Sequence, residues 1–386
     1  MDNVIRLTGR IDTTNAGEWE QSIFSQLGTQ KDIIFDAAEL SYISSAGLRV
    51  LMKVIKQTGG EVKVVNVSRD VYDILDTTGF AQLMKVEKRM RELSVEGCEV
   101  IGQGFCGTVY RIDPETIVKV YSAPDSLPMI KNEQRLAKRA FVKGVPTAIS
   151  YDIVRVGGSY GSVFELLNAR SFNDHLINEP RRFDELLKQY VDFLKVVHSA
   201  EMDAGTMPMA KKMFMGYLDC IASSGDYLTG GQISRLKELF SALPDDLHMV
   251  HGDFQMKNVM IVNGEPMLID MDTVATGQPL FDLQALYVTY VLFSEDDPDN
   301  LKSFLGIPNE WGGRIWQSIL SNYFNAADEH RLSLIQDKIS LAASVRFLYL
   351  LVSTDLKEGE LGEKRVRRAQ AHISELLEKV NDLFIR

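Results

Sequence analysis

One loop and the hairpin after it concentrate side chains that could hold a metal ion and move a proton. Asp253 and Asn258 are five residues apart, a spacing that fits a tight loop and not one face of a helix. Two short apolar runs follow, residues 259–262 and 267–269, and an Asn-Gly pair begins the turn between them, which is a strong hairpin signal. Because a hairpin brings its ends together, we expect Asn258 at its entry to lie near Asp270 at its exit.

These side chains suit the transfer of a phosphoryl group. Mg²⁺ prefers oxygen ligands, and in phosphoryl transfer it is bound together with the phosphates of the nucleotide. A separate carboxylate can accept or orient the proton of the attacking hydroxyl. We therefore predict Asn258 and Asp270 as metal ligands and Asp253 as the catalytic base. The alternative is a polar turn in an ordinary α+β domain.

The loop His251-Gly252-Asp253 with Asn258 resembles the catalytic loop of the kinase-like phosphotransferases. The match is to the branch with aminoglycoside phosphotransferases and choline kinases, where the loop reads H-G-D-x-x-x-x-N. Protein kinases have Arg in place of Gly252 and a long activation segment that ends in Ala-Pro-Glu, whereas here helical periodicity resumes soon after the hairpin. The resemblance implies that Asp282 buttresses the catalytic loop and that Asp272 either binds a second metal ion or supports a ligand.

A glycine-rich stretch lies upstream, where Gly102, Gly104 and Gly107 have the spacing G-x-G-x-x-G. This spacing also occurs in dinucleotide-binding loops, but those open a helix. Here residues 108–112 and 116–121 read as two strands joined by a turn. A glycine hairpin followed by a strand with a lysine is what the kinase-like fold places over the phosphates of ATP.

The resemblance implies further nucleotide contacts. Lys119 would bind the α and β phosphates, and Glu133 would be its ion-pair partner, since it is the only acid in the helix expected at residues 127–141. The apolar strand that begins at residue 163 would end in the hinge, where the backbone around Glu165 to Leu167 would bind adenine. The alternative for the lysine is a solvated strand position. Cys106 in the glycine loop is interpreted as a small spacer.

The first 93 residues show a different pattern. Strands expected near residues 4–12, 32–36, 61–67 and 84–86 alternate with helices near 15–27, 45–57 and 68–75, which predicts a small α/β domain. Residues 7–12 (LTGRID) and 40–51 (LSYISSAGLRVL) resemble the opening strand and the phosphorylation loop of STAS domains, the anti-sigma-factor antagonist family. The resemblance implies a protein partner, anti-sigma-factor-like, that docks here and is released by phosphorylation.

The position that matches the phosphorylated serine of that family is Ser45, and Ser44 occupies a place usually held by Asp. A phosphate at a helix N-terminus would add about −1.5 to −2 charges beside unpaired backbone N–H groups. The alternative is that Ser44 or Ser45 only caps the helix, which serine often does.

The predicted fold class is an α/β STAS domain followed by an α+β two-lobed protein-kinase-like fold with a helical C-terminal lobe. The 386 residues suffice for two or three domains. We expect the boundary in a charge-rich segment, with domains at residues 1–93 and 94–386, and lobes at about 94–167 and 168–386. In the second lobe, helices are expected near residues 182–200, 211–222, 232–243, 283–293, 311–327, 332–354 and 366–385.

The composition limits the classes of partner, compartment and substrate that we expect. The net charge of −11 disfavours nucleic acid as a partner. No apolar run has the roughly 18 residues of a membrane span. The three cysteines have no metal-binding spacing, so a reducing cytoplasm is expected. An acidic second domain could favour a cationic substrate, although solubility explains the charge as well.

Three functions remain open. The first is a kinase that uses ATP and Mg²⁺ to phosphorylate a small alcohol, such as an aminoglycoside, choline-like or sugar hydroxyl, with the STAS domain as regulator. The second is a protein kinase that phosphorylates a STAS serine, either Ser45 or that of a partner. The third, a catalytically idle nucleotide-binding scaffold, is disfavoured because no catalytic residue is missing.

Overall fold

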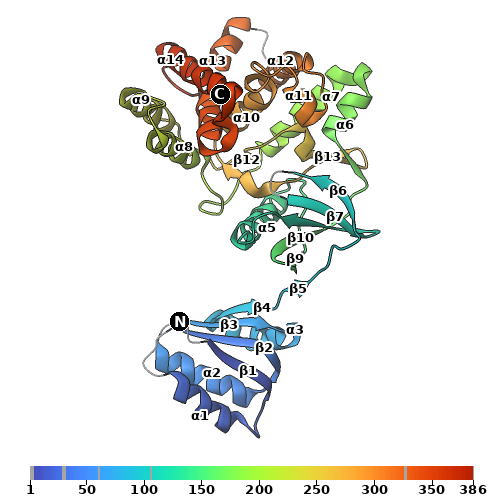
Figure 1. Ribbon diagram of the computed structural model, residues 1–386, viewed down its shortest axis with the longest axis vertical. Helices are drawn as coiled ribbons and strands as arrows, with labels where there is room; N and C mark the ends of the chain where they lie inside the picture. Colours follow the sequence, from blue (N-terminus) through green and yellow to red (C-terminus); the bar gives the residue numbers. More distant parts are fainter. Residues whose placement is uncertain (1–3, 28–31, 60, 105–106, 326–327, 386) are drawn as a thin grey trace. The chain divides into compact units, whose positions relative to one another are not determined.

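The computed structural model describes residues 4–27, 32–59, 61–104, 107–325 and 328–385 (Figure 1). The chain divides into two compact units, Met1–Glu96 with Ile153–Tyr160 and Gly97–Asp152 with Gly161–Arg386. The predicted fold class is confirmed, because a parallel sheet with helices is followed by a mixed sheet and a helical region. The domain boundary near residue 94 stays a prediction.

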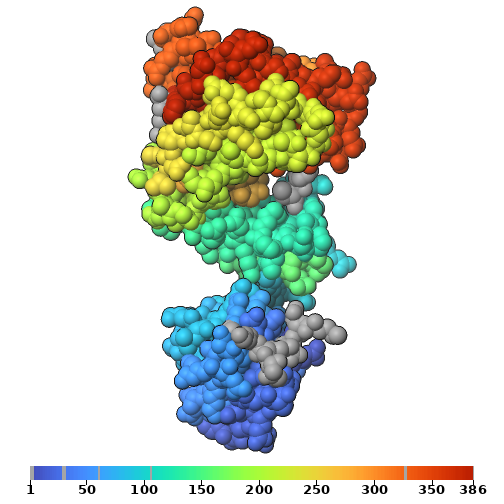
Figure 2. Space-filling model, turned by 90° about the vertical axis from the view of Figure 1, so that its left-hand side faces the viewer, coloured from blue at the N-terminus to red at the C-terminus, as the bar shows by residue number. Residues whose placement is uncertain are grey.

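The N-terminal part is a four-stranded sheet with every pair of neighbours parallel. Along two of its strands, buried residues mostly alternate with exposed or partly exposed ones, so one face of the sheet packs into the core and the other is more open to solvent. This part is drawn in blue in Figure 2, and its buried apolar residues, among them Leu7 and Phe35, form a cluster of their own. The strands are β1 (Val4–Ile11), β2 (Ile33–Ile43), β3 (Val62–Val67) and β4 (Lys85–Lys88), and the helices α1 (Ala16–Leu27), α2 (Ser45–Thr58), α3 (Arg69–Thr77) and α4 (Phe80–Leu83).

A six-stranded sheet follows, in which β6, β7, β8 and β10 pair antiparallel in the order β10-β8-β7-β6. The helix α5 (Leu127–Val142) comes directly after β8 and carries Glu133. This sheet contains the strands expected around the glycine-rich loop. Its members are β5 (Arg91–Glu92), β6 (Glu99–Gln103), β7 (Gly107–Asp113), β8 (Thr116–Tyr121), β9 (Asp152–Val156) and β10 (Ser159–Glu165).

The remaining chain is mainly helical and packs around α13 (Glu329–Ser353), which contacts α8, α10, α12 and α14. From residue 339 to 348 nearly every side chain of α13 is buried, as expected of a central helix. The other helices are α6 (Phe172–Asn178), α7 (Phe183–Val197), α8 (Ala210–Ser224), α9 (Gly230–Ser241), α10 (Leu280–Tyr287), α11 (Asn300–Leu305), α12 (Trp311–Phe324) and α14 (Gly359–Lys379).

Some predicted helix bounds were wrong. The helix expected over residues 283–293 is α10 followed by a π-helical segment, Val288–Leu292. The helix expected over residues 366–385 begins earlier, at Gly359, and ends at Lys379. Apolar periodicity marks the buried face of a helix, and it continues into packed non-helical segments such as the buried Val380 and Leu383. No helix in the described part of the chain combines the length and the apolar composition needed to span a bilayer.

Two small sheets position the polar loop and the hairpin. The strands β13 (Val259–Val262) and β14 (Glu265–Leu268) form the expected hairpin, and β11 (Ala169–Ser171) pairs with β13. The turn is only Asn263-Gly264, both with positive φ of 53° and 87°, which suits a two-residue hairpin turn. The strands β12 (Met249–Val250) and β15 (Ala275–Thr276) pair on either side of the loop and hairpin.

Candidate active site

The loop after β12 is fixed through His251, which is fully buried. Its ring Nε2–H donates to the carbonyl of Ile269 at 3.1 Å, and its Nδ1 accepts the N–H of Asp253 at 3.3 Å. These two partners define a neutral imidazole with the proton on Nε2. The histidine therefore links the start of the loop to the end of the hairpin.

Gly252 cannot carry a side chain in this loop. Its φ is +81°, and a Cβ atom would lie 2.6 Å from the carbonyl oxygen of Thr273. An arginine at this position, as in protein kinases, would need another backbone path. The departure from the protein-kinase pattern noted in the sequence thus has a local steric cause.

Asp282, at the start of α10, accepts hydrogen bonds from the backbone of the loop and so supports it, as the resemblance implied. Its carboxylate is fully buried and accepts the N–H of His251 at 2.8 Å and the N–H of Gly252 at 2.5 Å. His198 Nε2 lies 2.9 Å from the same carboxylate, and His198 Nδ1 lies 2.7 Å from the hydroxyl of Tyr323. Burial alone would raise the pKa of Asp282, but the hydrogen bond from His198 and the other donors lower it, so the group is a carboxylate.

Asp253 and Asn258 are in direct contact. Asn258 Nδ2 donates to the carbonyl oxygen and to Oδ2 of Asp253, both at 3.0 Å. Gln255 Nε2 also donates to Oδ2 of Asp253, at 2.7 Å. These donors fix one carboxylate oxygen, Oδ2. Because Asn258 uses its amide nitrogen here, its amide oxygen is the atom that would bind a metal ion.

The hairpin brings Asp270 to the same place, as expected. Ile269 N–H donates to the carbonyl of Asn258 at 3.0 Å, so Asp270 follows directly after a contact with Asn258. Asp270 adopts a left-handed backbone conformation, with φ of 62°, which is uncommon for a residue with a side chain. Such conformations are tolerated where the surrounding structure requires them, frequently at functional sites.

Lys119, Glu133 and Asp270 form one ionic cluster from three separate elements. Lys119 Nζ lies 2.5 Å from Asp270 Oδ1 and 3.6 Å from Glu133 Oε1. Burial works against the charge on Lys119, but the two carboxylates outweigh it and raise the pKa of this lysine well above its usual range. The structure thus brings together the lysine and glutamate that the resemblance paired, and adds the predicted metal ligand.

Tyr121, the last residue of β8, adds a buried hydroxyl group to this cluster. It was not predicted as a site residue from the sequence. Its hydroxyl donates to Glu133 Oε2 at 2.7 Å and lies 3.3 Å from Ser162 Oγ. Tyr121 and Glu133 are 2% and 6% exposed. Burial and the nearby carboxylate raise the pKa of the tyrosine, so it stays a hydrogen-bond donor to Glu133 at neutral pH.

The glycine-rich stretch forms a hairpin between β6 and β7, so the dinucleotide-binding alternative is wrong. Gly104 N–H donates to the carbonyl of Gly107 at 2.9 Å. A Cβ atom on Gly107 would lie 2.1 Å from the carbonyl oxygen of Val120, so the pairing with β8 requires glycine there. Gly102 lies in β6 opposite Val109. Phosphate binding by these glycines stays a prediction, and Cys106 lies outside the described residues.

The expected hinge lies where β10 ends. Glu165 is its last residue, and the N–H of Leu166 donates to the carbonyl of Glu115 at 2.7 Å. The N–H of Leu166 is thus used within the sheet. Adenine contacts by Glu165 and Leu167 stay a prediction.

Asp272 lies on a short turn after Asp270 and is titratable near neutrality. Burial, and next the charges of Asp270 and Glu133, raise its pKa to about 7. Burial and the neighbouring carboxylates disfavour the negative charge of Asp272. A bound cation would stabilise that charge. A role as second metal ligand or as support for a ligand stays open.

The residues present fit a magnesium ion held together with phosphates. Asp270 offers a carboxylate whose side chain is 37% exposed, and Asn258, whose backbone carbonyl accepts the N–H of Ile269, offers an amide oxygen. Among the described residues no cluster of three or more His, Cys, Asp or Glu side chains could hold a metal alone. Mg²⁺ at kinase sites uses one or two protein ligands plus phosphate and water oxygens, so this donor set is sufficient.

Several residues that hold the loop were missed. Tyr190 donates its hydroxyl to the carbonyl of Phe254, and Tyr290 accepts the N–H of Met256 at 3.2 Å. From the sequence these tyrosines were expected to pack in the core of the helical region. No local signal distinguishes a tyrosine that only packs in the core from one that also forms a hydrogen bond with the loop. Lys257 was also missed, although it is adjacent to Asn258. Its ammonium lies 3.6 Å from the ring centroid of Phe304 and interacts with the charges of Asp253 and Asp270.

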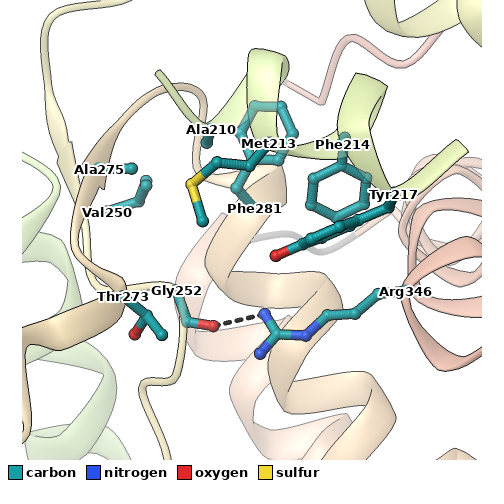
Figure 3. Close-up of a pocket in the computed structure, with 10 residues that line it drawn as sticks. All are labelled: Ala210, Met213, Phe214, Tyr217, Val250, Gly252, Thr273, Ala275, Phe281 and Arg346. Atoms are coloured by element: carbon teal, nitrogen blue, oxygen red, sulfur yellow. Dashed lines mark hydrogen bonds between the residues drawn. The ribbon is translucent and has the colours of Figure 1, made fainter. Parts of the chain in front are cut away.

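A small cavity adjoins the catalytic loop (Figure 3). It encloses about 20 Å³, which is room for about one water-sized group. Arg346 of α13 reaches its rim, and its Nη1 donates to the carbonyl of Gly252. The lining residues are Ala210, Met213, Phe214, Tyr217, Val250, Gly252, Thr273, Ala275, Phe281 and Arg346.

In the N-terminal part, Ser44 and Ser45 have different roles. Ser44 is the N-cap of α2, and its side chain accepts the N–H of Ala46 at 3.2 Å. Ser45 is the first residue of the helix, and its side chain is exposed. The capping alternative therefore applies to Ser44, and phosphorylation of Ser45 stays a prediction.

Comparisons with known proteins match two parts of the chain to two families. The family model described as "Phosphotransferase enzyme family" matches residues 97–306, more than half of the chain, and the STAS domain model matches residues 2–93. The provisionally named anti-sigma factor antagonist BtrV of Bordetella bronchiseptica is 30% identical over 84 residues, which are 21% of this chain and 72% of that protein.

Solved structures also resemble the chain. The ADP-bound aminoglycoside phosphotransferase APH(2'')-Ib matches with a TM-score of 0.50 and 15% identity, covering 80% of this chain and 99% of that chain. The apo form of a thermostable mutant of APH(4)-Ia has a TM-score of 0.49 and 13% identity, covering 74% and 97% of the two chains. At this identity the first likeness shows the fold alone.

Proposed function

The chain belongs to the phosphotransferase enzyme family and carries a STAS domain, and from this premise we propose that it transfers the γ-phosphoryl group of ATP to a hydroxyl group of a small molecule. In this proposal the STAS domain regulates the transfer or couples it to a protein partner. Aminoglycoside-, choline- or sugar-like alcohols are the candidate acceptors from the family resemblance.

The observation that supports this most strongly is the convergence of Lys119, Glu133 and Asp270. They come from a strand, a helix and the end of a hairpin, yet both carboxylates lie within 4 Å of one lysine. A half-buried lysine paired with two acids differs from the solvated strand lysine of the alternative reading. It does suit a site in which a cation contacts phosphates and a carboxylate binds the accompanying metal.

In this proposal each side chain of the site has a separate role in the transfer. Asp253 Oδ1 would accept or orient the proton of the acceptor hydroxyl, while Gln255 and Asn258 hold Oδ2 in place. Lys119, oriented by Glu133, would bind the phosphates. The amide oxygen of Asn258 and the carboxylate of Asp270 would hold Mg²⁺. The ion, when bound, would supply positive charge that stabilises the transferred phosphoryl group.

The proposed role of the STAS domain rests on the exposed Ser45 at the start of α2. A phosphate there would lie at the N-terminus of a 14-residue helix, where backbone N–H groups favour negative charge. It would also place about two negative charges on a surface that a protein partner could contact. Phosphorylation would then change the affinity for that partner.

The proposal is tested by measuring ADP formation by the purified full chain with Mg·ATP and a panel of alcohols. We expect ADP formation that depends on one class of acceptor and an acceptor product whose mass has increased by one phosphate. Binding of ATP without turnover of any acceptor, and without phosphate on the protein, would favour an idle nucleotide-binding scaffold instead.

A second candidate is a protein kinase acting on a STAS serine. It is favoured by the difference between Ser44, whose side chain caps α2, and Ser45, whose side chain is exposed. An exposed hydroxyl at a helix start is accessible to a kinase in trans. Phosphate on Ser45 after incubation with Mg·ATP would support this candidate.

A further inference from the structure

We infer that the cavity beside the catalytic loop receives part of the acceptor and selects alcohols that are neutral or anionic near the reacting hydroxyl, against cationic ones. This inference rests on the proposed function and names the substrate class of the same site. It is opposite to the expectation that the acidic composition of the second domain favours a cationic substrate.

The cavity is adjacent to the base proposed for the reaction. Gly252 lines it and precedes Asp253 in the chain, and Thr273 lines it from the other side of the loop. Figure 3 shows the carbonyl of Gly252 and the guanidinium of Arg346 meeting at its rim. The cavity therefore borders the backbone of the loop that carries Asp253.

Arg346 is the one charged residue among those that line the cavity, and no carboxylate does so. Its Nη1 donates to the carbonyl of Gly252, and this is its one hydrogen bond within the described part of the chain. A guanidinium has five N–H donors, so others remain for a ligand. A carboxylate, phosphate or hydroxyl of the acceptor could accept them, whereas an ammonium group would be repelled.

The remaining walls are apolar and aromatic, and aromatic rings can also bind cations through their faces. In this cavity, ring–ring contacts and the charge of Arg346 oppose cation binding by the aromatic rings. Tyr217 stacks one face on Tyr349, with ring centroids 4.0 Å apart, and Phe214 packs at tilted angles against Phe240 and Phe281. The rings are occupied by each other, and the charge next to them is already positive. The walls thus provide apolar contact and not a cation cage.

The small volume sets a second limit. At about 20 Å³ the cavity cannot take in a whole acceptor, so only one end of the acceptor would contact it and the rest would lie outside. The acceptor would place a compact end against Met213 and Tyr217 and direct its hydroxyl toward Asp253.

The test uses the full chain and small alcohols that differ in charge. Choline and 3,3-dimethylbutan-1-ol have the same shape, and one has a quaternary nitrogen where the other has carbon. The third alcohol, 3-hydroxypropanoate, carries a carboxylate. We expect kcat/KM to be lowest for choline, with about a fivefold or larger difference from its neutral isostere, the effect of one partly exposed charge pair.

Variants of Arg346 separate this inference from a loss of catalysis, because the ratio between acceptors is compared within each protein. Arg346→Lys keeps the charge and should keep the order of the three alcohols. Arg346→Gln keeps a donor for the Gly252 carbonyl and should reduce the ratio between the anionic and neutral alcohols by about fivefold. If Arg346→Gln does not fold, Met213→Glu, which adds a carboxylate to the cavity wall, should shift the preference toward choline.

A preference for choline in the wild type overturns the inference. An order of acceptors that neither variant changes also overturns it, as does a protein that binds Mg·ATP but phosphorylates none of the three alcohols. Binding of Mg·ATP, measured without any acceptor, tests the proposed function separately. Its absence would reject the proposed function, whereas a higher kcat/KM for the cationic acceptor than for its neutral isostere would reject this inference alone.

Discussion

Lys119 Nζ lies 2.5 Å from Asp270 Oδ1, although 151 positions separate the two residues in the chain. One comes from the sheet that carries the glycine loop, and the other follows the hairpin after the catalytic loop. The pair therefore connects the proposed phosphate-binding and metal-binding parts of the site. It also means that a change to either residue alters the electrostatics of both parts.

Asp253→Asn should reduce kcat by a factor of about 10² to 10⁴, the usual contribution of a positioned general base. Asparagine keeps the contacts to Gln255 and Asn258 but cannot accept the proton. Calorimetric titration should show an ATP affinity within about twofold of the wild type. The matched control is Asp226→Asn, an exposed acid between α8 and α9, and normal turnover in Asp253→Asn would reject the assignment.

Asp270→Asn should abolish the advantage that Mg²⁺ gives to ATP binding. The measurement is the Kd of ATP with Mg²⁺ and with EDTA, for wild type and variant. We expect the ratio of the two constants to fall toward one in the variant, since the amide is a weaker magnesium ligand than a carboxylate. A ratio equal to that of the wild type would show that Asp270 does not hold the metal.

Tyr121→Phe removes the hydroxyl that donates to Glu133 at 2.7 Å. The buried carboxylate then depends on Lys119 alone, so we expect a loss of stability of about 1–3 kcal/mol and a several-fold increase in the KM for ATP. Tyr151→Phe is the control, because Tyr151 is 59% exposed and lies away from this carboxylate. Equal effects of the two substitutions would contradict a positioning role for Tyr121.

Asp282→Asn should destabilise the second unit by about 3 kcal/mol at pH 7, because a buried acceptor of several N–H groups is replaced by an amide that also donates. The pKa of Asp282 is lowered in the folded protein. Its contribution is therefore fully present above its unfolded pKa of about 3.9 and is lost as the pH falls through the folded value. Urea unfolding should show the difference between wild type and variant at pH 7 and a smaller difference below pH 4.

The control for this comparison is Asp299→Asn, an exposed acid that should leave stability within about 0.5 kcal/mol of the wild type. A difference between wild type and Asp282→Asn that grows on acidification would have the wrong sign for a carboxylate with a lowered pKa.

Intact-mass measurement after incubation with Mg·ATP separates the two candidate functions. If the enzyme acts on small alcohols, the wild-type chain should gain no phosphate, while ADP forms with the right acceptor. If it acts on STAS serines, the chain should gain one phosphate that is absent in both Ser45→Ala and Asp253→Asn. Ser44→Ala, which removes only the cap of α2, should still gain it.

The sequence determined those features that depend on neighbouring residues. The hairpin was predictable because Asn263-Gly264 adopts the left-handed conformations that a two-residue turn needs. The glycine loop was distinguished from a dinucleotide loop because strand-like residues flank it. The α/β order of the first unit followed from the alternation of strand and helix patterns, and family resemblance then supplied the pairing of Lys119 with Glu133.

Only the tertiary structure decided the contacts that cross between elements. Arg346 meets Gly252 across 94 positions, and His198 meets Asp282 across 84. Periodicity shows that a residue lies on a helix face, but the packing of the core determines what that face touches. Arg346 is half-buried in a helix whose other neighbouring positions are core, so no local pattern could reveal that it reaches the catalytic loop. The charge at the cavity beside that loop, and with it the inferred class of acceptor, therefore depends on the fold and not on any motif.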